Sequence, residues 1–150
     1  MPVFAFLTAS AMPASAGETH LSFGFRSVDN HEDAEIYARR ITDRRVGPLN
    51  LAYGGALTEE GAVWVGVGLQ RDWVLSGPWY VSASVMPGLR DRGGGPDLGH
   101  TVQIRSGLEI GRQFGAGALG IGIDHISNAG LGEDNPGSNA LFLRYRLPVR

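Results

Sequence analysis

The chain has 150 residues, a formal net charge of −2 and no cysteine. This length is enough for one domain, the charge gives no reason to expect a nucleic-acid partner, and the absence of cysteine excludes disulfides and thiolate chemistry. Glycine accounts for 23 residues, about twice its usual share of ~7%. Because no low-complexity block holds this excess, the glycines are spread through apolar stretches, as in strands that pack closely or bend.

The N-terminal residues predict an export signal. Residues 1–6 lead into a short apolar run, and Ala14-Ser15-Ala16 has the A-x-A pattern of a cleavage site. The basic segment of a complete signal is missing, because no Lys or Arg precedes Arg26. We therefore expect residues 1–16 to be a truncated signal peptide and residues 17–150 to form a single domain. The alternative is that residues 1–16 are only an apolar tail.

The rest of the chain alternates between apolar and other residues with a period of two. This pattern predicts eight strands, near residues 19–28, 34–42, 47–57, 61–72, 77–87, 98–111, 116–127 and 138–148. The second is the weakest, because its charges fall on both faces. The sequence contains no run of 18 apolar residues, so it predicts no transmembrane helix. Eight antiparallel strands with short links are typical of an all-β, up-and-down barrel.

Periodicity alone does not decide which face of the barrel lies inside. A soluble lipocalin-like carrier has its apolar face inward, whereas an outer-membrane barrel has it outward in lipid. The other face here is rich in glycine and carries both charge signs, at Arg105, Glu109, Asp124, Arg144 and Arg146. The apolar face is uniform, and aromatic residues stand near strand ends, at Tyr53, Trp73, Trp79 and Tyr145. These features favour an eight-stranded antiparallel outer-membrane β-barrel.

The same alternation predicts the two rims of the barrel. If the N-terminus is periplasmic, residues 88–97 and 128–138 become loops on the outer rim. The turns near residues 43–46 and 112–115 then lie on the periplasmic rim.

A polar motif interrupts the apolar face at the end of the seventh strand. His125-Ile-Ser127-Asn128-Ala-Gly130 is followed by Asn135-Pro136-Gly137-Ser138-Asn139. His125 and Ser127, two residues apart on a strand, project from the same face, and Asn139 projects from that face of the paired strand. Polar side chains there are unfavourable without partners, and a base–nucleophile pair with an orienting group supplies partners. The alternative is that the histidine and serine only mark the rim where lipid meets loop.

This motif resembles the active-site signature of the outer-membrane lipid A 3-O-deacylases, the PagL family of ester hydrolases. The resemblance covers the last two strands specifically and the rest only as a barrel. It implies that Ser127 is the nucleophile, His125 the general base, and Asn139 the residue at the position of the family's acid. It also implies oxyanion or substrate binding by Asn128, Gly130 and Asn135. The expected substrate is lipid A or lipopolysaccharide in the bacterial outer membrane.

Asn139 is the departure from the family's Ser–His–Glu triad. A carboxamide can accept a hydrogen bond from the imidazole, but it cannot stabilise the imidazolium that forms when Ser127 attacks. Three outcomes stay open: a slow or differently wired esterase, an enzyme that uses Glu133 or Asp134 from the loop as its acid, and a barrel that only binds lipid or is structural.

Other motifs add no second function. Gly115-Ala-Gly117-Ala-Leu-Gly120 matches G-x-G-x-x-G but enters a strand, whereas a dinucleotide site needs it to open a helix. The remaining histidines share no metal-ligand spacing, so we expect neither a metal nor a cofactor. The sequence leaves the oligomeric state open, a homodimer included.

Overall fold

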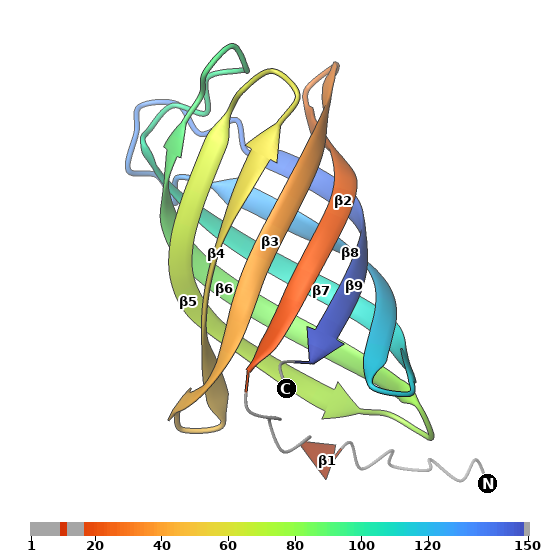
Figure 1. Ribbon diagram of the computed structural model, residues 1–150. Coiled ribbons are helices and arrows are strands. Elements are labelled where there is room, and N and C mark those ends of the chain that lie inside the picture. Colours follow the sequence, from red (N-terminus) through yellow and green to blue (C-terminus); the bar gives the residue numbers. More distant parts are fainter. Residues whose placement is uncertain (1–9, 12–16, 149–150) are drawn as a thin grey trace, which may run out of the picture.

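A computed structural model describes residues 10–11 and 17–148. The chain forms a closed antiparallel barrel in which each strand pairs with the next and the last pairs with the first (Figure 1). Its strands are β2 (Glu18–Val28), β3 (His31–Val46), β4 (Leu49–Thr58), β5 (Val63–Val74), β6 (Trp79–Asp91), β7 (Val102–Phe114), β8 (Gly117–Ser127) and β9 (Ser138–Pro148). A two-residue strand, β1 (Ser10–Ala11), pairs with the end of β5. Apart from β1, the predicted signal peptide lies outside the described residues.

The predicted fold class is confirmed, and the largest difference concerns the second predicted strand. Expected at 34–42, it is the 16-residue β3. Its charges fall on both faces, as predicted: Asp33, Glu35 and Arg39 are buried inside, whereas Glu32 and Arg40 occupy outward-facing positions. The predicted rim segments also shift, since 88–91 and 43–46 still belong to strands. Among the described residues, no helix is long and apolar enough to cross a membrane.

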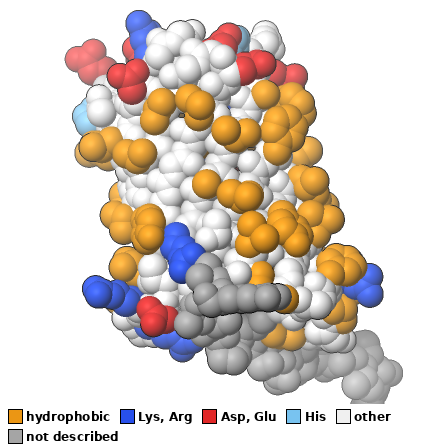
Figure 2. Space-filling model, in the orientation of Figure 1, with side chains coloured by type: hydrophobic (Ala, Val, Ile, Leu, Met, Phe, Trp, Pro, Cys, Tyr) orange, Lys and Arg blue, Asp and Glu red, His pale blue; other side chains and the backbone are white. Residues whose placement is uncertain are grey.

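The outer surface of the barrel is apolar around its middle. Large hydrophobic side chains on alternate positions of every barrel strand are exposed, as in Leu21, Phe23 and Phe25 of β2. Figure 2 shows these side chains over the middle of one face, with charged side chains gathered at the two ends. An exposed apolar belt between charged rims is the surface of a barrel in lipid.

The interior is filled by two clusters of ion pairs. In the first, Arg26 and Arg105 bind Glu35 and Asp124, all of them buried. In the second, buried Glu109 accepts hydrogen bonds from Arg144, Arg146 and Tyr80 and lies 3.6 Å from Arg39. The inward charges predicted from the sequence are thus paired with one another.

An aromatic cluster lies beside these ion pairs and accounts for part of the glycine excess. Tyr37, Trp64 and Met86 are buried together, and the rings of Tyr37 and Trp64 meet edge to face. A Cβ atom on Gly88 would lie 2.7 Å from the Trp64 indole, and one on Gly66 would lie 2.4 Å from it. The strands therefore carry glycine where a large inward side chain crosses them.

The connections differ in length at the two ends. The links at 47–48, 75–78 and 115–116 are short and share one rim with the start of β2 and the end of β9, whereas the longest loops, 92–101 and 128–137, lie on the other (Figure 1). Outer-membrane barrels have short periplasmic turns and longer extracellular loops. The rim with loops 92–101 and 128–137 is therefore the extracellular one.

Candidate active site

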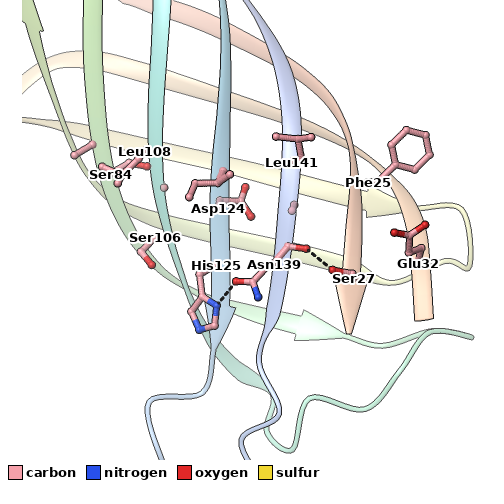
Figure 3. Close-up of a pocket in the computed structure, with 14 residues that line it drawn as sticks. Phe25, Ser27, Glu32, Ser84, Ser106, Leu108, Asp124, His125, Asn139 and Leu141 are labelled. Atoms are coloured by element: carbon pink, nitrogen blue, oxygen red, sulfur yellow. Dashed lines mark hydrogen bonds between the residues drawn. The ribbon is translucent and has the colours of Figure 1, made fainter. Parts of the chain in front are cut away.

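A histidine–asparagine pair stands on the outer wall near the extracellular rim. His125 of β8 and Asn139 of β9 are direct cross-strand partners, and both side chains are exposed. The Nδ1 atom of His125 lies 2.8 Å from Oδ1 of Asn139 (Figure 3). Because a carboxamide oxygen only accepts, Nδ1 carries the proton in this pair, and in the neutral ring Nε2 is then the nitrogen with the lone pair. The imidazole is thus in the tautomer that a general base requires.

Gly137 closes one side of the imidazole. Its φ is +66°, a conformation that side chains rarely adopt. A Cβ atom there would lie 2.9 Å from Cε1 of His125 and 3.4 Å from Nε2. The backbone of the Asn-Pro-Gly turn therefore fixes where the ring can lie.

Ser127, the predicted nucleophile, is the last residue of β8 and is half-buried. It stands two residues beyond His125, one step closer to the rim, and pairs across the ladder with Ile104. Its hydroxyl makes no hydrogen bond with the His125 ring or with any other described residue. Catalytic hydrogen bonds are often long without substrate and tighten when it binds.

His125 and Asn139 belong to a longer line of polar side chains, which we call the polar row. It crosses five neighbouring strands through consecutive cross-strand pairs, in the order Ser106, His125, Asn139, Ser27 and Glu32. The Ser27 hydroxyl donates to the Asn139 carbonyl at 3.5 Å. The next outward-facing line toward the membrane centre is wholly apolar, consisting of Leu108, Ile123, Leu141 and Phe25. Polar and apolar groups meet here along one boundary.

A shallow groove of about 890 Å³ follows this boundary. All five members of the polar row line it, together with the four apolar side chains beneath them (Figure 3). The inward-facing Asp124 contributes to the floor, but its carboxylate is bound to Arg26 and Arg105 in the interior. The groove can therefore hold an amphipathic molecule, with its polar part at His125 and an apolar chain on the belt.

The predicted oxyanion residues hold the extracellular loops together. The fully buried Asn128 carboxamide donates to the carbonyls of Leu98 and Asp134 and accepts from the Gly130 N–H. The Asn128 backbone N–H donates to Oδ1 of Asn135 at 3.0 Å. An oxyanion role for Asn128 or Gly130 would require these bonds to break. The Nδ2 group of Asn135 makes no hydrogen bond to any described residue.

Sequence reasoning missed three residues that face the groove. In the sequence, Ser106 only interrupts the apolar face of its strand. The sequence around Ser27 did not indicate which residues it pairs with across the sheet. Glu32 lay outside the predicted second strand, so its cross-strand partner could not be predicted. The longer β3 pairs it with Ser27. The loop acids considered as substitutes, Glu133 and Asp134, are exposed and do not line the groove.

A protein-family model described as lipid A 3-O-deacylase (PagL) matches residues 29–148. The chain belongs to the PagL family. That membership, together with the apolar belt, places the protein in the bacterial outer membrane. A search among curated proteins finds no match.

Solved structures agree with the PagL-family fold. The crystal structure of the outer membrane enzyme PagL is 18% identical, with a TM-score of 0.72 over 88% of this chain and 99% of that one. A de novo designed transmembrane β-barrel is 11% identical, with a TM-score of 0.63 over 92% of this chain and 100% of the design. Neisserial surface protein A is also 11% identical, with a TM-score of 0.61 over 93% of this chain and 99% of that one. At these identities the structures establish the barrel.

Proposed function

We propose that this PagL-family protein is an esterase that hydrolyses the 3-position acyl ester of lipid A. The observation that carries the proposal is the His125–Asn139 hydrogen bond on the lipid-facing wall, with Nε2 of His125 left as a base and Ser127 two residues away. The membership of the family supports the choice of substrate. The groove supports it too, because its polar row and apolar belt match an ester joined to an acyl chain.

The reaction proceeds in two steps. The Ser127 oxygen attacks the ester carbonyl carbon while its proton passes to Nε2 of His125. The bond between the carbonyl carbon and the sugar oxygen then breaks, and that oxygen leaves with the proton from His125. Water attacks the resulting acyl-enzyme, gives a proton to His125 and releases a 3-hydroxy fatty acid as Ser127 recovers its own proton.

The free Nδ2 group of Asn135 is our candidate for the oxyanion donor. Oδ1 of Asn135 accepts the N–H of Asn128, the residue directly after Ser127, so the carboxamide lies close to the nucleophile. Its two N–H donors need no existing bond to break. A preorganised donor of this kind is worth about 10²–10³ in turnover in other hydrolases.

A second candidate function is a barrel that binds lipid without turning it over. Asn139 favours it, because a neutral amide replaces the carboxylate that would stabilise the imidazolium. In serine proteases, replacing the aspartate of the catalytic triad by asparagine lowers turnover about 10⁴-fold. Both candidates use the same groove.

Mass spectrometry of lipid A incubated with the detergent-purified protein separates the two functions. We expect the wild type to remove one 3-hydroxyacyl chain and Ser127→Ala to remove none. Ser106→Ala is the matched control, since it deletes the other hydroxyl beside His125 in the ladder. If Ser106→Ala abolishes the reaction and Ser127→Ala does not, the nucleophile has been misassigned. If the wild type leaves lipid A intact, the lipid-binding barrel stands.

A further inference from the structure

We infer that the periplasmic rim of the barrel binds the head groups of anionic glycerophospholipids in the inner leaflet of the outer membrane. The binding surface consists of arginines at the periplasmic ends of three strands, which we call the basic rim: Arg40, Arg44 and Arg45 of β3, Arg71 of β5 and Arg112 of β7. The inference is independent of the proposed esterase, because it concerns the opposite end of the barrel.

The two rims of the barrel carry opposite charges. At the extracellular rim, exposed carboxylates outnumber the arginines Arg90 and Arg92; they include Asp29, Glu32, Glu59, Asp91, Glu133 and Asp134. On the face that Figure 2 shows, acidic side chains predominate at that end and basic ones at the other. A phosphodiester anion is therefore attracted to the periplasmic rim and repelled by the extracellular one.

The charge of the basic rim is not neutralised within the part of the chain that the structure describes. None of its five arginines forms an ion pair with a described residue, whereas interior arginines such as Arg105 and Arg146 do. Arg40 donates a hydrogen bond to the Thr19 hydroxyl at 3.1 Å, which leaves its charge uncompensated. Asp43, the exposed carboxylate of this rim, pairs with none of the five. The basic rim therefore needs an anion from outside.

Arg112 shows that this anion belongs to a lipid. It is exposed on the outer wall, and its two cross-strand neighbours, Trp79 and Leu119, are exposed large hydrophobic residues. Its guanidinium carbon lies 5.0 Å from the centre of the Phe114 ring and 6.0 Å from that of the Trp79 ring. An arginine among exposed apolar side chains at a barrel rim stands where acyl chains meet head groups.

Two further arginines of the basic rim stand beside aromatic residues on the outer wall. The guanidinium carbon of Arg71 lies 5.2 Å from the centre of the Trp73 ring, and Arg40 pairs across the strands with the exposed Tyr53. Aromatic girdles of membrane barrels lie at the level of the head groups. These arginines are thus held at the depth of the lipid phosphates.

The chemistry of the guanidinium favours an anionic phospholipid over a zwitterionic one. An arginine whose face lies on an aromatic ring keeps N–H groups at its edge, and two of them can bind two oxygens of one phosphate. A zwitterionic head group brings its own ammonium, which competes with arginine for that phosphate. An anionic head group has no such internal cation.

Fluorescence quenching tests which lipid lies beside Trp79. The chain has three tryptophans; Trp64 is buried in the interior, and a Trp73→Phe background leaves Trp79 as the exposed one. The protein is reconstituted in equimolar vesicles of phosphatidylglycerol and phosphatidylcholine, with bromine near the head group of only one of the two lipids. Arg112→Gln is compared with Arg92→Gln, the same change at an exposed arginine of the extracellular rim.

We expect phosphatidylglycerol to be enriched about fivefold over phosphatidylcholine beside Trp79, the effect of one arginine near an anionic lipid surface. Arg112→Gln should remove most of this preference, Arg112→Lys should keep part of it, and Arg92→Gln should leave it unchanged. Because charges at the rim are screened by ions, the preference should also fall as sodium chloride is raised to about 1 M.

Three results would overturn the inference: equal quenching by the two brominated lipids in the wild-type rim, a preference that persists in Arg112→Gln, and a preference that high salt leaves unchanged. Inorganic phosphate at constant ionic strength distinguishes a free anion from a lipid. Loss of the preference in phosphate would mean a site for a soluble anion and would also overturn the inference. The salt series needs no substitution at Arg112, so it decides the question even if Arg112→Gln fails to fold.

Discussion

Replacing Asn139 by glutamate should accelerate the reaction. The substitution puts a carboxylate oxygen where Oδ1 of Asn139 now lies, 2.8 Å from Nδ1 of His125. Asn139 is exposed on the outer wall, so the extra methylene group meets no packed interior. The new charge stabilises the imidazolium formed in the transition state and leaves the neutral ground state nearly unaffected, so the effect falls on kcat.

The magnitude follows from the distance and the surroundings. Two unit charges about 4 Å apart attract by ~4 kcal/mol at an effective dielectric constant near 20. Water at the rim screens an exposed pair and reduces this to about 1 kcal/mol. We therefore expect kcat to rise about fivefold.

The assay is the initial rate of 3-hydroxy fatty acid release from lipid A in micelles, measured by mass spectrometry. Asn139→Gln is the matched control, because it has the length of glutamate without the charge, and it should be no faster than the wild type. Equal rates for Asn139→Glu and Asn139→Gln would refute the reasoning, since length and not charge would then govern the site.

Three further predictions test the supporting structure. Gly137→Ala combines a strained φ with a contact of 2.9 Å to Cε1 of His125. It should lower kcat at least tenfold and lower the free energy of unfolding by about 1–2 kcal/mol. Normal turnover would mean that this turn does not fix the ring. Asn128→Ala leaves three loop groups without a hydrogen-bond partner. Each group that water does not reach should lower stability by about 1–3 kcal/mol. Amide hydrogen exchange should therefore become faster in residues 92–101 and 128–137 but not in the strands. Glu109→Gln removes the charge that pairs with Arg144 and Arg146 and should lower the free energy of unfolding by about 3–5 kcal/mol in urea titrations from micelles; an unchanged midpoint would contradict the pairing.

The barrel could be predicted from the sequence because a strand's alternation is a local property. Leu119, Ile121 and Ile123 alternate with glycines and Asp124 whatever the rest of the chain does, and β8 forms where that alternation predicts it. Local reasoning failed at β3, where the destination of each charge depends on strands far along the chain. Glu35 can be buried only because Arg26 and Arg105 meet it inside the barrel.

The candidate site could likewise be predicted only in part from the sequence. The spacing of His125 and Ser127 and the register of β8 against β9 follow from neighbouring stretches of sequence, so the His125–Asn139 pair could be anticipated. Glu32 could not, because its place depends on the closure of β9 onto β2, a pairing between opposite ends of the domain. The engagement of Asn128 with Leu98 likewise joins two loops that lie 30 residues apart.

The location of the groove on the side wall determines how a substrate arrives. The interior is packed with ion pairs and aromatic rings, so no lipid travels through the barrel, and the groove opens sideways to the outer leaflet near the extracellular rim. An amphipathic molecule already anchored in that leaflet meets the site by lateral diffusion in two dimensions, without leaving the bilayer. For the proposed esterase, turnover would then depend on the surface density of lipid A in the outer leaflet and on the fluidity of that leaflet.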